Sequence, residues 1–255
     1  MTSRTPLPMT WEVGQRLGEM LRTGQDLGAL ARQWAVTSRH FLLPDKTGWT
    51  PLHEAARLGR LPSIVQVTGP AQDWFTLADL HARAGSDATP LHYAAGKGCL
   101  PDAAALLGPE AKGLTQAQLN VFTSDLGATP LHEAVATDEL ASYVAVLRLA
   151  GEGLTAAPFL IPERDNPART PLNVAEKWQR LEKLFAPEHW AGRLTEMMEL
   201  WRHVSEEGRR QLDLERVLNE TALLSRRRIE PAVFHGAARA ALPGLPEIPT
   251  REVRR

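Results

Sequence analysis

Apolar residues in the middle of the chain recur with the spacing of short amphipathic helices. Leu61, Ile64 and Val65 have the three- and four-residue spacing that places side chains on one face of a helix. A preceding helix is expected to begin at Pro51, because proline suits the first helical position and the threonine before it can cap the helix. It is expected to end at Gly59, because glycine tolerates a left-handed turn. This segment therefore predicts a helix hairpin.

The start signal of this hairpin returns along the chain. Thr-Pro-Leu-His begins at Thr50, Thr89 and Thr129, and an altered copy, Thr-Pro-Leu-Asn, begins at Thr170, with spacings of 39, 40 and 41 residues. A second marker has nearly the same period: it consists of Thr37, Thr76, Thr115, Thr155 and Thr195. After Thr76 and Thr115 an acceptor side chain follows at the third residue, which is the capping-box pattern of an extra helical turn. A fixed period of this length indicates units that stack on their neighbours.

The residues around the tetrapeptide resemble the ankyrin-repeat family, whose signature includes Thr-Pro-Leu-His-x-Ala. The match is strong in units starting at Asp45, Ala84 and Ser124 and partial in a unit starting at Asp165, so the likeness covers roughly residues 45–185, although Ala84 and Ser124 replace the leading aspartate. Family repeats have about 33 residues. The longer units here resemble those of bacterial ankyrin-like proteins, and the fourth unit has Asn173 in place of the signature histidine.

The resemblance implies an all-α fold, an ankyrin-repeat solenoid of stacked helix-turn-helix units with a helical cap at each end. Residues 1–44 are predicted to form an N-terminal helical cap or degenerate repeat, with helices at 11–22 and 26–34. The repeats occupy residues 45–186 and start near 45, 84, 124 and 165. Residues 187–228 are predicted to form the C-terminal helical cap, and residues 229–255 a flexible basic tail.

Three tryptophans lie near the start of the predicted C-terminal cap. We expect Trp178, Trp190 and Trp201 to pack beneath it, because helical periodicity continues through this region. The alternative is an exposed aromatic docking face.

The charge of the chain is nearly balanced, at a formal −1, and gives no overall reason to expect nucleic acid or an anionic membrane as the partner. Residues 225–255 contain seven arginines and three glutamates, so nucleic-acid binding through this tail is one alternative, centred on Arg226, Arg227 and Arg228. A solvated helix end is the favoured interpretation of that triplet. There is no secretory signal in the first thirty residues and no apolar stretch near the ~18 residues of a membrane span.

The single cysteine, Cys99, fits a reducing compartment, so a cytoplasmic protein is expected, with Cys99 as a small buried residue. His53-Glu54 and His132-Glu133 resemble the opening of a zinc-protease helix, but that motif needs a second histidine at the positions of Arg57 and Ala136. The signature histidines are instead expected to bond to adjacent loops. We therefore assign no catalytic, cofactor or metal residue and expect no enzyme activity.

The family resemblance implies partner contacts at the tips of the finger loops and near the end of each first helix. In this chain those positions are Lys46, Thr47, Trp49, Arg57, Leu58, Gly85, Ser86, Ala88, Lys97, Asp125, Leu126, Ala136, Thr137, Asn166, Arg169 and Lys177. Trp49 with Arg57 is the favoured anchor, because tryptophan and arginine dominate binding hot spots. The alternative role for Trp49 is to cover the N-terminal cap.

The favoured function is a non-enzymatic protein-protein interaction module that presents a concave groove to another protein, with a monomer as the favoured state. Two further alternatives are open. One is an immunity or inhibitor protein that blocks a toxin or enzyme. The other is an effector or enzyme whose site lies in residues 187–255.

Overall fold

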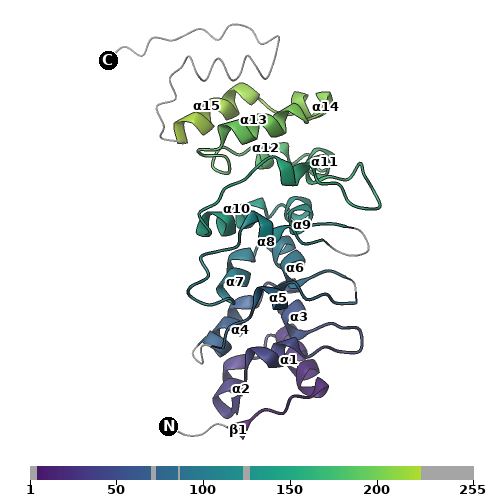
Figure 1. Cartoon of the computed structure of the whole chain (residues 1–255), viewed down its shortest axis with the longest axis vertical. Helices are drawn as coiled ribbons and strands as arrows, with labels where there is room; N and C mark the ends of the chain where they lie inside the picture. The colour runs from purple at the N-terminus through teal and green to yellow at the C-terminus, as the bar shows by residue number, and fades with distance from the viewer. Residues whose placement is uncertain (1–4, 70–72, 86, 123–126, 225–255) are drawn as a thin grey trace, which may run out of the picture.

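The computed structural model describes residues 5–69, 73–85, 87–122 and 127–224 (Figure 1). Within them nearly all of the regular secondary structure is helical, which confirms the predicted all-α class. The α-helices are α1 (Trp11–Thr23), α2 (Leu27–Gln33), α3 (Pro51–Arg57), α4 (Leu61–Thr68), α5 (Leu77–Leu80), α6 (Pro90–Gly96), α7 (Leu100–Ala105), α8 (Gln116–Leu119), α9 (Pro130–Thr137), α10 (Leu140–Leu149), α11 (Pro171–Lys177), α12 (Leu181–Leu184), α13 (Leu194–Arg202), α14 (Glu206–Arg210) and α15 (Leu214–Leu224). The 3-10 helices η1 (Ser38–Leu42) and η3 (Ala157–Leu160) and the two-residue parallel strands β1 (Thr5–Pro6) and β2 (Trp34–Ala35) complete the described part.

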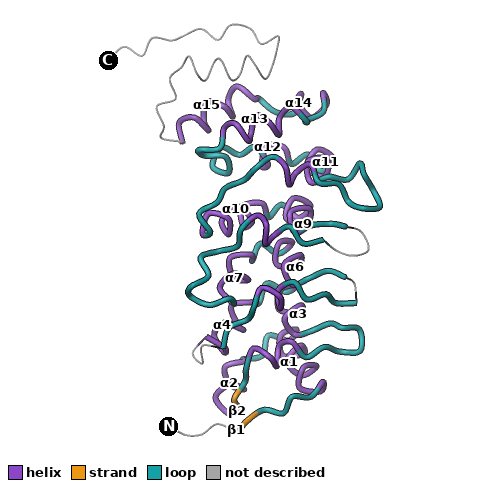
Figure 2. The backbone as a smooth tube through the Cα atoms, viewed as in Figure 1, coloured by secondary structure: helices purple, strands orange, loops and turns teal. Residues whose placement is uncertain are grey.

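The helices are arranged in two parallel rows along the long axis of the molecule. One row consists of the first helices α1, α3, α6, α9 and α11, each of which packs against the next. The other contains the second helices α2, α4, α7 and α10, which also pack in succession. Figure 2 shows loops projecting from the side of the first helices. These loops and helix ends therefore lie along one side of the molecule.

The first helices begin as local chemistry predicts. Each of α3, α6, α9 and α11 has threonine at the N-cap and proline in the first turn. The leucine after the proline is almost completely buried in all four; these residues are Leu52, Leu91, Leu131 and Leu172. The predicted helix start is therefore confirmed, and the leucine that follows the proline is a core residue between neighbouring helices.

The first helices also end alike, and this was only partly visible in the sequence. A residue with positive φ follows each of the five, and these residues are Gly24, Gly59, Gly98, Asp138 and Gln179. Gly59 fulfils the predicted stop. The last two positions are not glycine, so composition alone did not mark them.

The signature histidines connect each first helix to the loop that follows, as predicted. The Nε2–H of each ring donates to a carbonyl oxygen of that loop: His53 to Ala82 (3.1 Å), His92 to Ala128 (3.0 Å) and His132 to Arg169 (3.3 Å). The Nδ1 atom lies 2.8 to 2.9 Å from the hydroxyl of the threonine three residues earlier. Burial lowers the pKa of each ring to about 4, so all three are neutral near pH 7. In the fourth copy Asn173 Nδ2 donates instead to Ala168 O, within its own loop.

The second threonine marker has a structural basis at four of its five positions. Thr76 and Thr115 form the predicted capping boxes at the start of α5 and α8. Thr37 caps η1, and Thr155 precedes η3. Thr195 is different, because it lies inside α13.

Two of the three predicted C-terminal tryptophans form the core there. Trp190 is fully buried and Trp201 nearly so, and Phe185 lies 6.3 Å and 5.4 Å from their ring centroids. The prediction for Trp178 was wrong: its side chain is 59% exposed. The reason is its place at the end of α11, one residue before the left-handed Gln179, where the guanidinium of Arg180 covers its ring at 5.8 Å.

None of the described helices is both long and apolar enough to cross a lipid bilayer. The predicted basic tail, residues 229–255, and the arginine triplet at 226–228 lie outside the described residues.

Candidate partner-binding face

Most of the predicted partner-binding residues lie along the side formed by the first helices and their preceding loops. We call this side the recognition face. The exposed members are Lys46, Thr47, Arg57, Gly85, Lys97, Thr137, Asn166, Arg169 and Lys177. The partly buried members are Trp49, Leu58, Ala88 and Ala136, of which Leu58 and Ala136 pack against the core. Three predicted residues, Ser86, Asp125 and Leu126, lie outside the described residues.

The first finger loop is held in shape by Asp45. Its Oδ1 accepts hydrogen bonds from Thr47 N (2.8 Å), Thr47 Oγ1 (2.6 Å) and Trp49 N (3.0 Å). Burial alone would raise the pKa of Asp45, but these hydrogen bonds lower it below its ordinary value, so the carboxylate stays charged. The next loop packs directly on this one, because a Cβ atom at Gly85 would collide with the carbonyl oxygen of Thr47. Glycine is therefore needed at position 85 for the two loops to stack.

The fourth loop is longer than the first two. In the first two, a backbone hydrogen bond joins residues four apart, from Asp45 N to Trp49 O and from Ala84 N to Ala88 O. In the fourth, the corresponding bond runs from Glu163 N to Arg169 O, six residues apart. The two extra residues extend the loop tip around Asn166.

The shared left-handed ends place equivalent residues of the first helices in two rows on the recognition face. Five positions before each left-handed residue stand Glu19, Glu54, Tyr93, Glu133 and Val174, which we call the glutamate row. Two positions before it stand Arg22, Arg57, Gly96, Ala136 and Lys177, which we call the arginine row. Residues three apart in a helix lie on the same face, so each member of one row has its counterpart beside it.

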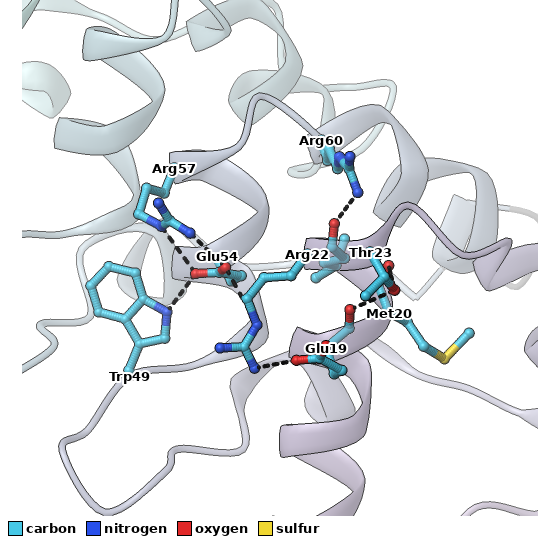
Figure 3. A network of polar contacts seen from close by, with 9 residues as sticks. Glu19, Met20, Arg22, Thr23, Trp49, Glu54, Arg57 and Arg60 are labelled. Carbon is cyan, nitrogen blue, oxygen red and sulfur yellow. Dashed lines mark hydrogen bonds and ion pairs between the residues drawn. The ribbon is translucent and has the colours of Figure 1, made fainter.

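Glu54 is the centre of the polar network drawn in Figure 3. Its carboxylate is only 6% exposed, and it accepts hydrogen bonds from Trp49 Nε1 (3.2 Å), Arg57 Nε (3.1 Å) and Arg57 Nη2 (2.7 Å). Arg22 of the preceding first helix approaches the same carboxylate at 3.8 Å while pairing with Glu19 at 3.0 Å. These contacts hold Trp49 and Arg57 in fixed positions beside each other.

A groove of about 690 Å³ lies between α1 and α3, next to this network. Its walls include Glu12, Glu19, Arg22, Asp45, Trp49 and Glu54. The ring of Trp49 packs edge-on against Tyr93 of the following helix pair, with centroids 5.1 Å apart. Trp49 therefore forms one wall of the groove and also packs onto α6.

Three further kinds of group were considered: metal-binding clusters, the single cysteine and the signature histidines. The described part of the chain holds no cluster of three or more His, Cys, Asp or Glu side chains that could bind a metal ion. Cys99 is buried, and burial raises its pKa to about 12, which leaves the thiol protonated and unreactive. The signature histidines are engaged with backbone carbonyls.

Several residues of the recognition face were not found from the sequence. Glu54 and Glu133 were read only as part of a metal motif, and Tyr93 was not considered. The signal was present, because all three directly follow a signature histidine. Trp178 also belongs to this face, since it occupies the helix-end position of Leu58, Lys97 and Thr137.

Comparison of the chain with models of known protein families and with curated proteins gave no match.

Proposed function

We propose that this chain is an ankyrin-type repeat solenoid with a helical cap at each end, and that it binds another protein through the recognition face. The observation that supports this most is the Glu54 network, in which Trp49 and Arg57 are fixed by hydrogen bonds before any partner arrives. Tryptophan, tyrosine and arginine are the residues most enriched at binding hot spots. Side chains that are already ordered lose little conformational entropy on binding, which favours affinity.

A protein suits this face better than a small molecule. The exposed positions extend over four successive helix pairs, whereas small-molecule sites are enclosed and mostly apolar. The groove beside Trp49 is lined mainly by polar and charged side chains. In this proposal the chain acts by binding its partner and catalyses no reaction.

The proposal is tested by affinity capture with the wild type and a Trp49→Ala, Arg57→Ala double variant. We expect the double variant to lose the captured partner. A matched control is Trp11→Ala, Arg202→Ala, because Trp11 is 47% exposed and Arg202 pairs with Glu199 three residues away, as Arg57 does with Glu54. Circular dichroism and thermal melting confirm that each variant is folded. If the double variant captures the same proteins as the wild type, the anchor of the binding site is not in the first predicted repeat.

A further inference from the structure

The three glutamates of the glutamate row have very different surroundings. Glu19 pairs with Arg22, and Glu54 contacts Arg22, Arg57 and the Trp49 indole. Within the described part of the chain, the carboxylate of Glu133 forms neither a hydrogen bond nor an ion pair at contact distance. It is nevertheless partly buried. Glu133 thus has the position of Glu54 without its cationic partners.

The missing partner corresponds to two small residues in the arginine row. Glu54 has Arg57 three residues later in its own helix, whereas Glu133 has Ala136 at that position. Glu54 also has Arg22 on the preceding first helix, whereas the equivalent residue for Glu133 is Gly96. A Cβ atom at Gly96 would lie 3.7 Å from Thr137 Cγ2, 3.8 Å from Glu133 Cβ and 3.9 Å from Glu133 Oε2, all ordinary contacts. Gly96 does not have a positive φ, so a side chain is also compatible with its backbone. A side chain at position 96 would therefore lie beside the Glu133 carboxylate, and the described part of the chain places no cationic side chain in either of these two positions.

The local charge favours a cation there. Burial raises the pKa of Glu133; Arg169 acts against this shift, and Glu163 adds to it. The guanidinium of Arg169 is already paired with Glu163 at 3.0 Å, and the Glu163 side chain is only 3% exposed. Two carboxylates thus share one arginine, which leaves a net negative charge.

We propose that Glu133, flanked by Gly96 and Ala136, receives an arginine side chain of the protein partner. This proposal rests on the proposed function and specifies part of its partner. A guanidinium is favoured over an ammonium because its planar fork of donors fits a carboxylate with two hydrogen bonds. The chain itself provides the template, since Arg57 binds Glu54 through Nε and Nη2 in this way.

The first test uses a blocked Gly-Ser-Arg-Ser-Gly peptide as the probe and its citrulline counterpart as the neutral control. Binding is followed by NMR through the backbone amide signals of Gly96 and Glu133. We expect the arginine peptide to shift both signals in a saturable way and the citrulline peptide to bind about tenfold more weakly or not at all, because it lacks the charge. Equal binding of the two peptides would overturn the proposal.

Variants then locate the site. Glu133→Gln should abolish the effect of the arginine peptide. Gly96→Arg should also abolish it, because the new side chain can reach Glu133, and it should lower the NMR-measured pKa of Glu133. Gly96→Ala is the matched control: it adds only the Cβ, so peptide binding and the pKa of Glu133 should stay as in the wild type. Binding that persists in Glu133→Gln, or in Gly96→Arg after the pKa has fallen, contradicts the proposal.

The two proposals fail separately. Peptide binding at Glu133 is measured without the partner, whereas partner capture tests Trp49 and Arg57, which lie outside the helix pair that contains Glu133. If the double variant at Trp49 and Arg57 captures the same proteins while the peptide still binds at Glu133, the proposed anchor is wrong and the arginine site stands.

Discussion

At the scale of single residues, the buried signature histidines should make the stability of the protein depend on pH. In the folded protein burial lowers the pKa of His53, His92 and His132 from 6.5 to about 4. In the unfolded chain they become protonated below pH 6.5, so between pH 6.5 and 4 the unfolded state binds more protons. The free energy of unfolding must then fall as the pH falls through this window.

We expect each histidine to contribute a loss on the order of 1–3 kcal/mol between pH 7 and pH 4. Urea denaturation at a series of pH values measures this. His92→Asn should reduce the slope, because asparagine does not titrate. A slope that is the same in His92→Asn as in the wild type would show that His92 is not held neutral by the fold.

The buried leucines of the first helices provide a second residue-scale prediction. Leu91 is fully buried between neighbouring helices, so Leu91→Ala should lower the free energy of unfolding by about 2–5 kcal/mol through the cavity it leaves. Leu149, which is 55% exposed, is the matched control, and Leu149→Ala should change stability by no more than about 0.5 kcal/mol. Both are measured by chemical denaturation. Equal effects of the two substitutions would mean that Leu91 is not in the core.

At the scale of elements, the ends of the first helices are defined by backbone geometry more than by residue type. Gln179 has φ 55°, a left-handed conformation that costs a residue with a Cβ atom about 1–2 kcal/mol. Gln179→Gly should remove that strain, although the greater freedom of glycine in the unfolded chain offsets part of the gain. We expect the free energy of unfolding to rise by about 0.5–1 kcal/mol, measured by denaturation.

The reverse substitution is the control. Gly59 has φ 67°, and a Cβ atom added there would have no neighbouring atom within 4 Å, so Gly59→Ala tests the backbone alone. It should destabilise the protein by about 1 kcal/mol. A destabilising Gln179→Gly together with a neutral Gly59→Ala would contradict a left-handed end at these helices.

An element could be predicted from the sequence where the residues that determine it lie within the element itself. The helix starts were predictable because the threonine cap and the proline act on their own turn. The ends at Asp138 and Gln179 were not, because neither residue is the glycine that marks a left-handed helix end in a sequence. Trp178 was misplaced for the same reason. Its exposure depends on where α11 ends, and an apolar residue in a helical pattern otherwise predicts burial.

At the scale of the whole molecule, the period of the sequence predicted which positions are equivalent, and the recognition face follows from that equivalence. The contacts between units could not be read in this way. Arg22 approaches Glu54 although the two are far apart in sequence, and this requires the register in which α1 packs on α3. The same register places Gly96 beside Glu133, which is why the open cation position became visible only in the structure.

The central claim is that one side of this molecule, made of the first helices and their loops, receives a protein partner. Site-specific photocrosslinking in cells that make the protein tests it most directly. A photoreactive residue is placed at Lys97, exposed at the end of α6, or at Ala105, exposed at the end of α7 in the same helix pair. The account predicts a crosslinked protein from position 97 and none from position 105. Crosslinking from position 105 without any from position 97 would contradict it.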